Sequence, residues 1–346
     1  MDFDLAAPIV AAATAAIAAG DCGYGHKGEL GEAFAAFAGK RLSWSPDPSL
    51  IFAIPDVMTG ITEMIQAVTP PGAGIVISPP VYPPFFYRLR LADRRVVEAP
   101  LRRADDGRYD LDPEALDRAL AANGVRAYLL CSPHNPTGRV WSRQQLATVA
   151  DICQRHGILL LVDEIHAPLV LPGAHHVPFG SLDHEMTTRS VTFSSASKAW
   201  NIPGLKCAVA VAGSAELAAL LSERWEALLA GQVGVLAAVA AFTESLPWLD
   251  ALLGQLDENR SLLSRLLAGH LPGVRYVPPE VSFLAWLDCR ALGLGDDPAQ
   301  AFLDRGRVAL SSGPDFGAQG LGFARLNIGT SPELMAEAVR RMAAAV

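Results

Sequence analysis

The sequence predicts an α/β protein in which helices cover a mostly parallel sheet. Between residues 50 and 215, short apolar runs rich in β-branched residues or leucine alternate with helical patterns. Several of these runs are apolar almost throughout, which is typical of strands that are buried on both faces. The pattern changes near Leu246-Pro247-Trp248, and we expect a smaller α+β lobe beyond that point.

Six strands are expected in the first part of the chain. They cover Gly74–Ser78, Arg95–Ala99, Arg126–Ser132, Gly157–Asp163, Ser190–Phe193 and Lys206–Ala212. Two helices between them have recognisable starts. Ser142 and Gln145 form a capping box, and Pro113 follows Asp112 at the first position of another helix.

The second part predicts a long helix at Trp248–Leu271, a strand at Ser282–Leu287 and a closing helix after Ser331-Pro332. We expect the Ala-rich N-terminal helix, Ala6–Ala19, to join this smaller lobe. The predicted division is a large domain at 21–246 and a small domain formed by 1–20 and 247–346.

Composition excludes several classes of protein. With 346 residues, 51% of them hydrophobic, the chain can bury a large core, and a net charge of −8 with scattered arginines argues against nucleic-acid binding. The longest uncharged stretch, Met64–Tyr87, holds six prolines, so we expect no membrane span. Five widely spaced cysteines without a C-x-x-C pair predict a reduced, cytoplasmic chain, and we expect no metal site.

Three polar clusters follow apolar strands: Ser132–Gly138, Asp163–His166 and Ser194–Lys198. Ligands of parallel α/β sheets bind at the carboxyl ends of strands, so these clusters are the first candidates for a site. Lys198 is one of only four lysines among 28 basic residues. A desolvated lysine there would have a lowered pKa and could form a Schiff base, although a solvated loop lysine is the alternative.

Asp163 ends an apolar strand, where an ionised carboxylate is costly unless it meets a cation. Taken alone, it could cap a turn or bind magnesium. Together, Asp163 and Lys198 are the two groups that pyridoxal 5′-phosphate needs, because the acid holds the ring nitrogen protonated and the amine binds the aldehyde carbon.

Three segments carry a family resemblance: Ser132–Trp141 (SPHNPTGRVW), Val162–His166 (VDEIH) and Ser195–Leu205 (SASKAWNIPGL). They resemble the fold-type I pyridoxal-phosphate enzymes of the class I/II aminotransferase superfamily, and within it the cystathionine β-lyase, or C–S lyase, branch. The resemblance implies a large domain with a mostly parallel seven-stranded sheet, a smaller α+β domain, and a homodimer with the active site between the domains.

The resemblance also assigns roles around the cofactor ring. Lys198 would bind the cofactor covalently and move the proton at the substrate α-carbon, while Asp163 would pair with the pyridinium nitrogen. Asn135 would donate a hydrogen bond to the phenolic oxygen, and His166 stands where many aminotransferases have a tyrosine that contacts the same oxygen. Tyr82 would stack on the ring.

The phosphate site that the resemblance implies consists of Ser195, Lys206 and the backbone of Val57-Met58 at the start of a helix. Tyr24 matches a tyrosine that reaches the phosphate of the neighbouring subunit.

Two further positions bear on bound anions. Arg325 matches the arginine that clamps the substrate α-carboxylate. Asp56 stands where the lyase branch usually has glycine, and we expect its carboxylate to face solvent rather than the phosphate.

The implied function is β-elimination from cystathionine or another cysteine S-conjugate, which yields a thiol, pyruvate and ammonia. An aminotransferase is the alternative, because the same residues serve both reactions. A third possibility is a regulatory or biosynthetic-cluster protein that binds pyridoxal phosphate without turning over sulfur amino acids.

Overall fold

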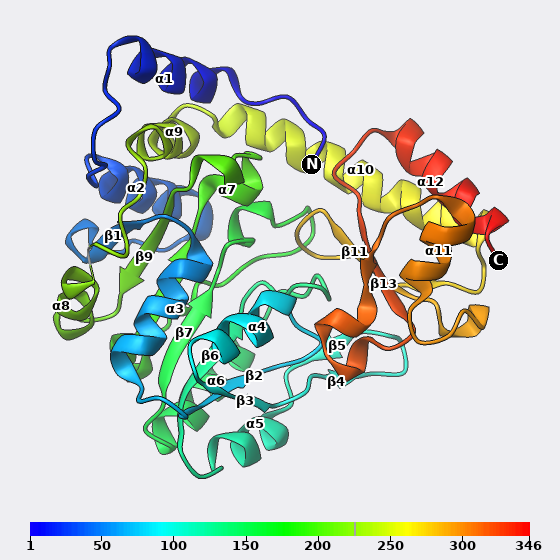
Figure 1. The fold of residues 1–346 in the computed structure, drawn as a ribbon, viewed down its shortest axis with the longest axis horizontal. Helices are drawn as coiled ribbons and strands as arrows, with labels where there is room; N and C mark the ends of the chain where they lie inside the picture. The colour runs from blue at the N-terminus through cyan, green and yellow to red at the C-terminus, as the bar shows by residue number, and fades with distance from the viewer. Residues whose placement is uncertain (225) are drawn as a thin grey trace.

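The computed structural model describes residues 1–224 and 226–346. Two bodies lie side by side in Figure 1, a large one around a seven-stranded sheet and a smaller one around a four-stranded sheet. The long helix α10 (Leu246–His270) extends from the large body along the smaller one. This arrangement confirms the predicted fold class.

The large sheet has the strand order β1-β9-β8-β7-β6-β2-β3. Its strands are β1 (Ile51–Ile54), β2 (Gly74–Ile77), β3 (Arg95–Glu98), β6 (Val125–Cys131), β7 (Leu159–Asp163), β8 (Ser190–Ser194) and β9 (Ala208–Ala212). Strand β9 runs antiparallel to both of its neighbours, and the other pairs are parallel. A mostly parallel seven-stranded sheet is therefore confirmed, with β1 as the strand that the sequence did not predict.

Helices cover both faces of this sheet. The helices of the large body are α1 (Ala7–Ala18), α2 (Leu30–Leu42), α3 (Val57–Val68), α4 (Pro83–Leu91), α5 (Pro113–Leu120), α6 (Arg143–Arg155), α7 (Ala196–Ala199), α8 (Ala215–Glu223) and α9 (Gln232–Thr243). Alternate residues of β6 serve opposite faces, since Leu129 packs with α3 and α4 and Leu130 packs with α5 and α6. The predicted caps are present, with a complete Ser142–Gln145 capping box at α6 and Pro113 at the start of α5.

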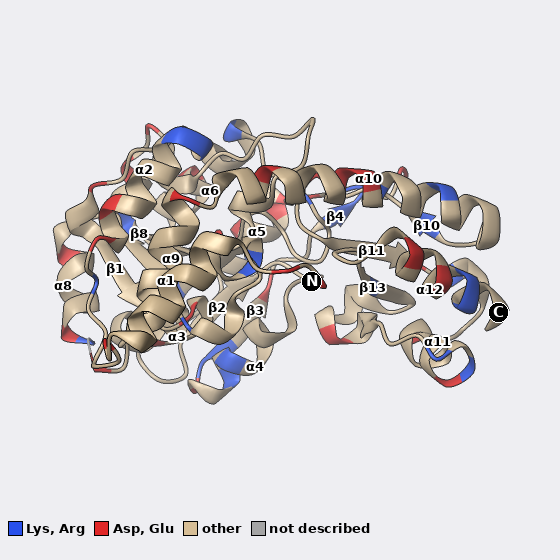
Figure 2. Cartoon of the chain, turned by 90° about the horizontal axis from the view of Figure 1, so that it is seen from above, with Lys and Arg blue, Asp and Glu red and all other residues tan. Residues whose placement is uncertain are grey.

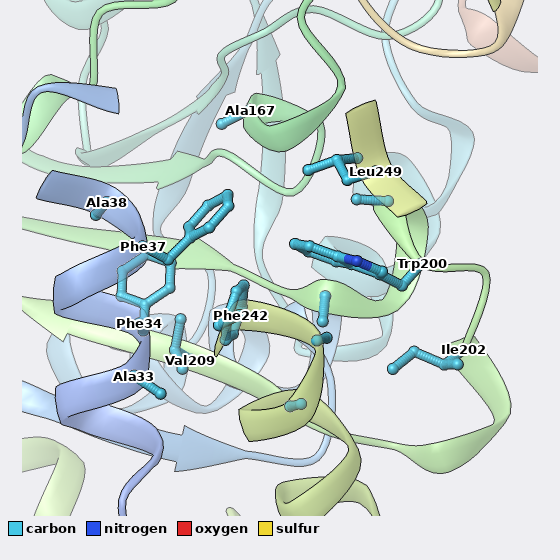
Figure 3. Packing of buried hydrophobic residues seen from close by; sticks show 14 of the residues in the cluster. Ala33, Phe34, Phe37, Ala38, Ala167, Trp200, Ile202, Val209, Phe242 and Leu249 are labelled. Atoms are coloured by element: carbon cyan, nitrogen blue, oxygen red, sulfur yellow. The ribbon is translucent and has the colours of Figure 1, made fainter. Parts of the chain in front are cut away.

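An aromatic cluster joins α2, α9 and the end of α7 (Figure 3). The rings of Phe37 on α2 and Phe242 on α9 have centroids 5.1 Å apart, and Trp200 meets Phe242 edge-on at 5.5 Å. The indole Nε1 of Trp200 also donates to the carbonyl of Ser245 at 3.0 Å. Because Trp200 directly follows α7, this cluster fixes the short helix that carries Lys198.

The smaller sheet is antiparallel, with the order β10-β11-β13-β12. Its strands are β10 (Arg275–Tyr276), β11 (Leu284–Asp288), β12 (Ser311–Ser312) and β13 (Phe323–Asn327), and it packs with α10, α11 (Pro298–Gly306) and α12 (Pro332–Ala344). A separate two-stranded ribbon pairs β4 (Arg102–Arg103) with β5 (Tyr109–Asp110). The long helix and the closing helix were both predicted from the sequence.

Helix α1 packs against α9 of the large body. This differs from the expectation that the N-terminal helix joins the smaller lobe. The residues ahead of α1 do reach that lobe, because the Asp2 amide donates to the Gly329 carbonyl at 2.8 Å. The domain division at residues 20 and 246 stays a prediction.

Among the described residues, no single helix has both the length and the apolar composition needed to cross a bilayer. The consecutive helices α9 and α10 meet those criteria only as a pair, and the pair is bent by 74°.

Candidate active site

A cavity of about 470 Å³ opens at the carboxyl ends of β6, β7 and β8, where β11 and β13 of the smaller sheet also reach it. It is large enough for a cofactor and part of a substrate. Ten of the eleven predicted site residues line it: Val57, Met58, Tyr82, Asn135, Asp163, His166, Ser195, Lys198, Lys206 and Arg325. The structure therefore brings together segments that are up to 268 positions apart, from Val57 to Arg325.

Lys198 lies on α7, directly after β8. The hydroxyl of Ser195 caps this helix by accepting from the Ser197 amide at 3.0 Å, and it donates to the Cys207 carbonyl at 2.7 Å. Burial lowers the pKa of Lys198, Arg325 adds to this effect, and Asp163 opposes it. A lysine whose amine is easier to deprotonate suits covalent attachment to an aldehyde.

Asp163 is buried at the end of β7, and its Oδ1 accepts from the Ile165 amide at 3.1 Å. Burial raises the pKa of Asp163 to about 6, although the Ile165 hydrogen bond and the nearby Lys198 lower it. A carboxylate in such a place is stabilised in its charged form by a cation at the open side of the cavity. A protonated pyridine nitrogen meets that requirement.

Arg325 on β13 is held by two neutral partners. Its guanidinium donates to Asn135 Oδ1 at 2.9 Å and to Ser311 Oγ at 3.1 Å, and it lies 4.9 Å from the centroid of the Phe316 ring. Burial lowers the pKa of Arg325 to about 10, and no ion pair to a carboxylate forms within the described part of the chain. A buried cation of this kind favours an anionic ligand. The same contact directs the Asn135 carbonyl toward Arg325, so its amide group is the part left to donate.

His166 and Tyr82 are both in neutral forms. His166 Nδ1 lies 3.0 Å from Ser282 Oγ, and burial lowers the pKa of His166 to about 3. Tyr82 precedes α4, and burial raises the pKa of its phenol, as does the charge of Asp163. Neither side chain therefore adds a charge to the cavity near neutral pH.

The start of α3, where a phosphate site was expected, borders the cavity. Its first amides, Val57 and Met58, have no acceptor inside the helix, because the first N–H groups of any helix lack one. The expectation for Asp56 is wrong: its side chain lines the cavity, accepts from the Thr59 amide at 2.8 Å and pairs with the Lys206 ammonium. The reason is that Asp56 is the N-cap of α3, and a capping carboxylate must turn toward the helix start.

Tyr24 is not brought into the cavity of its own chain. It forms an isolated β-bridge with Gly231, and the residue is 92% exposed. The role of Tyr24 at a neighbouring subunit therefore stays a prediction.

Several lining residues were not among the predicted site residues. Cys131 borders the cavity, and burial raises the pKa of its thiol well above the usual range. Pro84, Tyr87 and Arg88 line the cavity from α4. Their spacing of three and four residues places them on one helix face, which is the signal that would have identified them.

These residues fit pyridoxal 5′-phosphate. The ring nitrogen would meet a buried carboxylate that favours a cation, and the aldehyde would meet a lysine with a lowered pKa. The phosphate would meet the free amides at a helix start. The Asn135 amide is placed to donate to the phenolic oxygen.

Known proteins resemble the chain over its whole length. The family model described as aminotransferase class I and II matches residues 11–342. A Mycobacterium leprae protein named "Putative cystathionine beta-lyase" is 43% identical, covering 100% of this chain and 90% of its own length. A cystathionine beta-lyase of Bacillus subtilis is 36% identical, covering 88% of this chain and 80% of its own length.

A solved structure shares the fold. The crystal structure of cystalysin from Treponema denticola, which contains a pyridoxal 5′-phosphate cofactor, superimposes with a TM-score of 0.95 at 26% identity. The match covers 100% of this chain and 89% of that one. The motifs, the fold and the near-complete family match agree, and the chain belongs to the aminotransferase class I and II family.

Proposed function

We propose that the chain is a pyridoxal-phosphate-dependent C–S β-lyase that cleaves cystathionine or another cysteine S-conjugate to a thiol, pyruvate and ammonia. The observation that carries this proposal is the convergence of Lys198, Asp163 and Arg325 on one cavity. The relatives named as cystathionine beta-lyases support the lyase branch.

When bound, the cofactor accepts the electron pair that remains after the substrate loses its α-proton. Arg325 would hold the α-carboxylate, and so orient the Cα–H bond toward Lys198. The Lys198 amine takes the proton as this bond breaks. Asp163 keeps a proton on the ring nitrogen, because a carboxylate there stabilises the positive charge.

The second bond to break joins Cβ to sulfur, and its electron pair leaves with the sulfur. The thiolate takes up a proton and departs as a thiol. Hydrolysis of the remaining three-carbon unit gives pyruvate and ammonia, so one thiol forms for each pyruvate. The lysine, which is already protonated, can donate this proton.

An aminotransferase is the second candidate, because Lys198, Asp163 and Arg325 would serve transamination equally well. The two activities differ in their products. Purified protein is incubated with L-cystathionine and a panel of S-substituted cysteines, with and without a keto acid. Equal amounts of pyruvate and thiol without a keto acid support elimination, whereas strict dependence on the keto acid contradicts it.

The Lys198→Ala variant tests the covalent attachment itself. We expect it to lose elimination and the near-visible absorbance of lysine-bound cofactor. Retention of that absorbance in the variant would contradict the assignment of Lys198.

The assembly and location are also part of the proposal. The exposed Tyr24 supports a homodimer in which this side chain completes the partner's phosphate site. The five cysteines are free and four of them are buried, which supports a reduced, cytoplasmic setting.

A further inference from the structure

Arg88 is a charged residue of the cavity to which the proposed chemistry gives no role. It lies on α4, whose opposite face, formed by Phe85, Phe86 and Leu89, is buried in the core of the large body. This packing fixes the helix and holds Arg88 at the cavity wall. Figure 2 shows basic residues on the ribbon of α4.

The acidic groups of the cavity are already engaged. Asp56 pairs with Lys206. Asp163 lies near Lys198 and is assigned to the ring nitrogen. Within residues 1–224 and 226–346, the Arg88 guanidinium has no carboxylate within ion-pair distance and makes no side-chain hydrogen bond. Arg88 therefore lines the cavity without an acidic partner, while the other arginine of the cavity, Arg325, is assigned to the α-carboxylate.

Largely apolar side chains also line the cavity that the two arginines share. Tyr87 lies beside Arg88, and Phe283 and Ile165 also line the cavity. Such walls suit a thioether chain. A substrate that extends from Arg325 to Arg88 would have its α-carboxylate at Arg325 and the end of its sulfur substituent at Arg88, with the sulfur between them.

We propose that Arg88 determines specificity by binding a carboxylate at the far end of the substrate's sulfur substituent. This inference rests on the proposed function and names the substrate class, namely cysteine S-conjugates with two carboxylates. A bidentate guanidinium–carboxylate pair supplies both the affinity and the orientation.

The test compares matched substrates. S-(ω-carboxyalkyl)-L-cysteines with one to three methylenes are paired with the corresponding neutral amides, and pyruvate release is measured for each. We expect wild type to prefer the acids. In Arg88→Gln the ratio of kcat/KM for acid over amide falls roughly tenfold to a hundredfold, mainly through KM. Arg90→Gln, an exposed position on the same helix, is the control and leaves the ratio unchanged.

The outcomes separate the two proposals. If wild type releases pyruvate but Arg88→Gln keeps the wild-type ratio, the role of Arg88 is wrong and the lyase proposal stands. If wild type releases pyruvate from neither series, the lyase proposal fails. Binding is then followed through the cofactor absorbance, where loss of acid-over-amide selectivity in Arg88→Gln supports the role of Arg88 and equal selectivity contradicts it.

Discussion

The most informative residue of the site is Arg325, because its environment is incomplete without an anion. Ser311 lies directly opposite Arg325 in the β12–β13 register, which places its hydroxyl beside the guanidinium. The partners of Arg325 are therefore neutral, although burial already lowers its pKa to about 10. A substrate carboxylate would supply the missing charge.

We predict that Arg325→Gln lowers kcat/KM for every amino-acid substrate by roughly a hundredfold to a thousandfold, since a charge-assisted pair is lost. Steady-state kinetics measure the effect. Ser311→Ala, which removes one neutral hydrogen bond, is the matched comparison and costs roughly tenfold or less. Kinetics of Arg325→Gln that match wild type would rule out the carboxylate role.

Asp163 supports a second prediction at this scale. Asp163→Asn replaces the carboxylate with an amide of the same shape that does not stabilise a protonated ring nitrogen. We expect kcat to fall by at least roughly a hundredfold while Lys198 still binds the cofactor, because preorganised charge is removed from the reaction. Absorbance checks cofactor binding and pyruvate release checks the rate. A rate within tenfold of wild type argues against the pairing.

At the scale of elements, the ends of strands were the most predictable part of the site. Lys198 and Asn135 follow apolar strands and Asp163 ends one, and parallel topology places such ends together. Arg88 lies within α4, and the sequence pattern of that helix does not distinguish an arginine at a cavity from one in solvent. Ser282 owes its position to a backbone with φ of +77°, and neither that dihedral nor its contact with a histidine 116 positions away follows from local pattern.

Asp56 has two roles at the start of α3: it is the N-cap of the helix, and it lies beside the proposed phosphate site. Burial raises the pKa of Asp56, but hydrogen bonds from Lys206 and Thr59 outweigh burial, and the pKa is lowered overall. The carboxylate therefore keeps its charge beside the cradle. It stabilises the helix and neutralises Lys206, which the resemblance assigns to the phosphate site.

We predict that Asp56→Asn binds pyridoxal phosphate more tightly than wild type, because the cap remains while the negative charge is removed. Asp56→Ala should also bind more tightly but lose about 1 kcal/mol of stability with the cap. Titration of apoenzyme and urea unfolding measure these effects. Lys206→Gln is the opposite control and weakens binding. Weaker cofactor binding by Asp56→Asn would contradict the argument.

At the scale of the whole molecule, the sequence predicted the layers but missed some packing partners. Strand β1 was missed because it is an edge strand whose partner, β9, lies more than 150 positions along the chain, so no local pattern reveals the pairing. The predicted strand at Lys206 begins instead at Ala208, since Lys206 has a left-handed backbone with φ of +55°. Helix α1 is apolar on most of its surface, so its sequence does not specify a partner.

The buried His134 predicts how the free energy of unfolding depends on pH. His134 lies after β6 and joins it to the end of β2. Its Nε2 donates to the Ser78 carbonyl at 3.2 Å, and its Nδ1 accepts from Thr137 Oγ1 at 3.2 Å. The bond that Nδ1 accepts requires the neutral imidazole, because a protonated Nδ1 cannot accept, and burial lowers the pKa of His134 to about 3. In the folded chain, His134 therefore stays neutral at pH values well below 6.5.

Since the unfolded chain binds a proton at His134 below about pH 6.5 and the folded chain does not, stability is full above that pH and falls as pH drops toward 3. This group contributes a slope of about 1.4 kcal/mol per pH unit. His134→Gln keeps a donor for Ser78 but does not titrate. We expect the variant to be less stable than wild type at pH 7, with a difference that shrinks steadily toward pH 4 in urea unfolding. A difference that stays constant with pH would show that His134 has the same pKa in the folded chain as in the unfolded chain, which would contradict the argument.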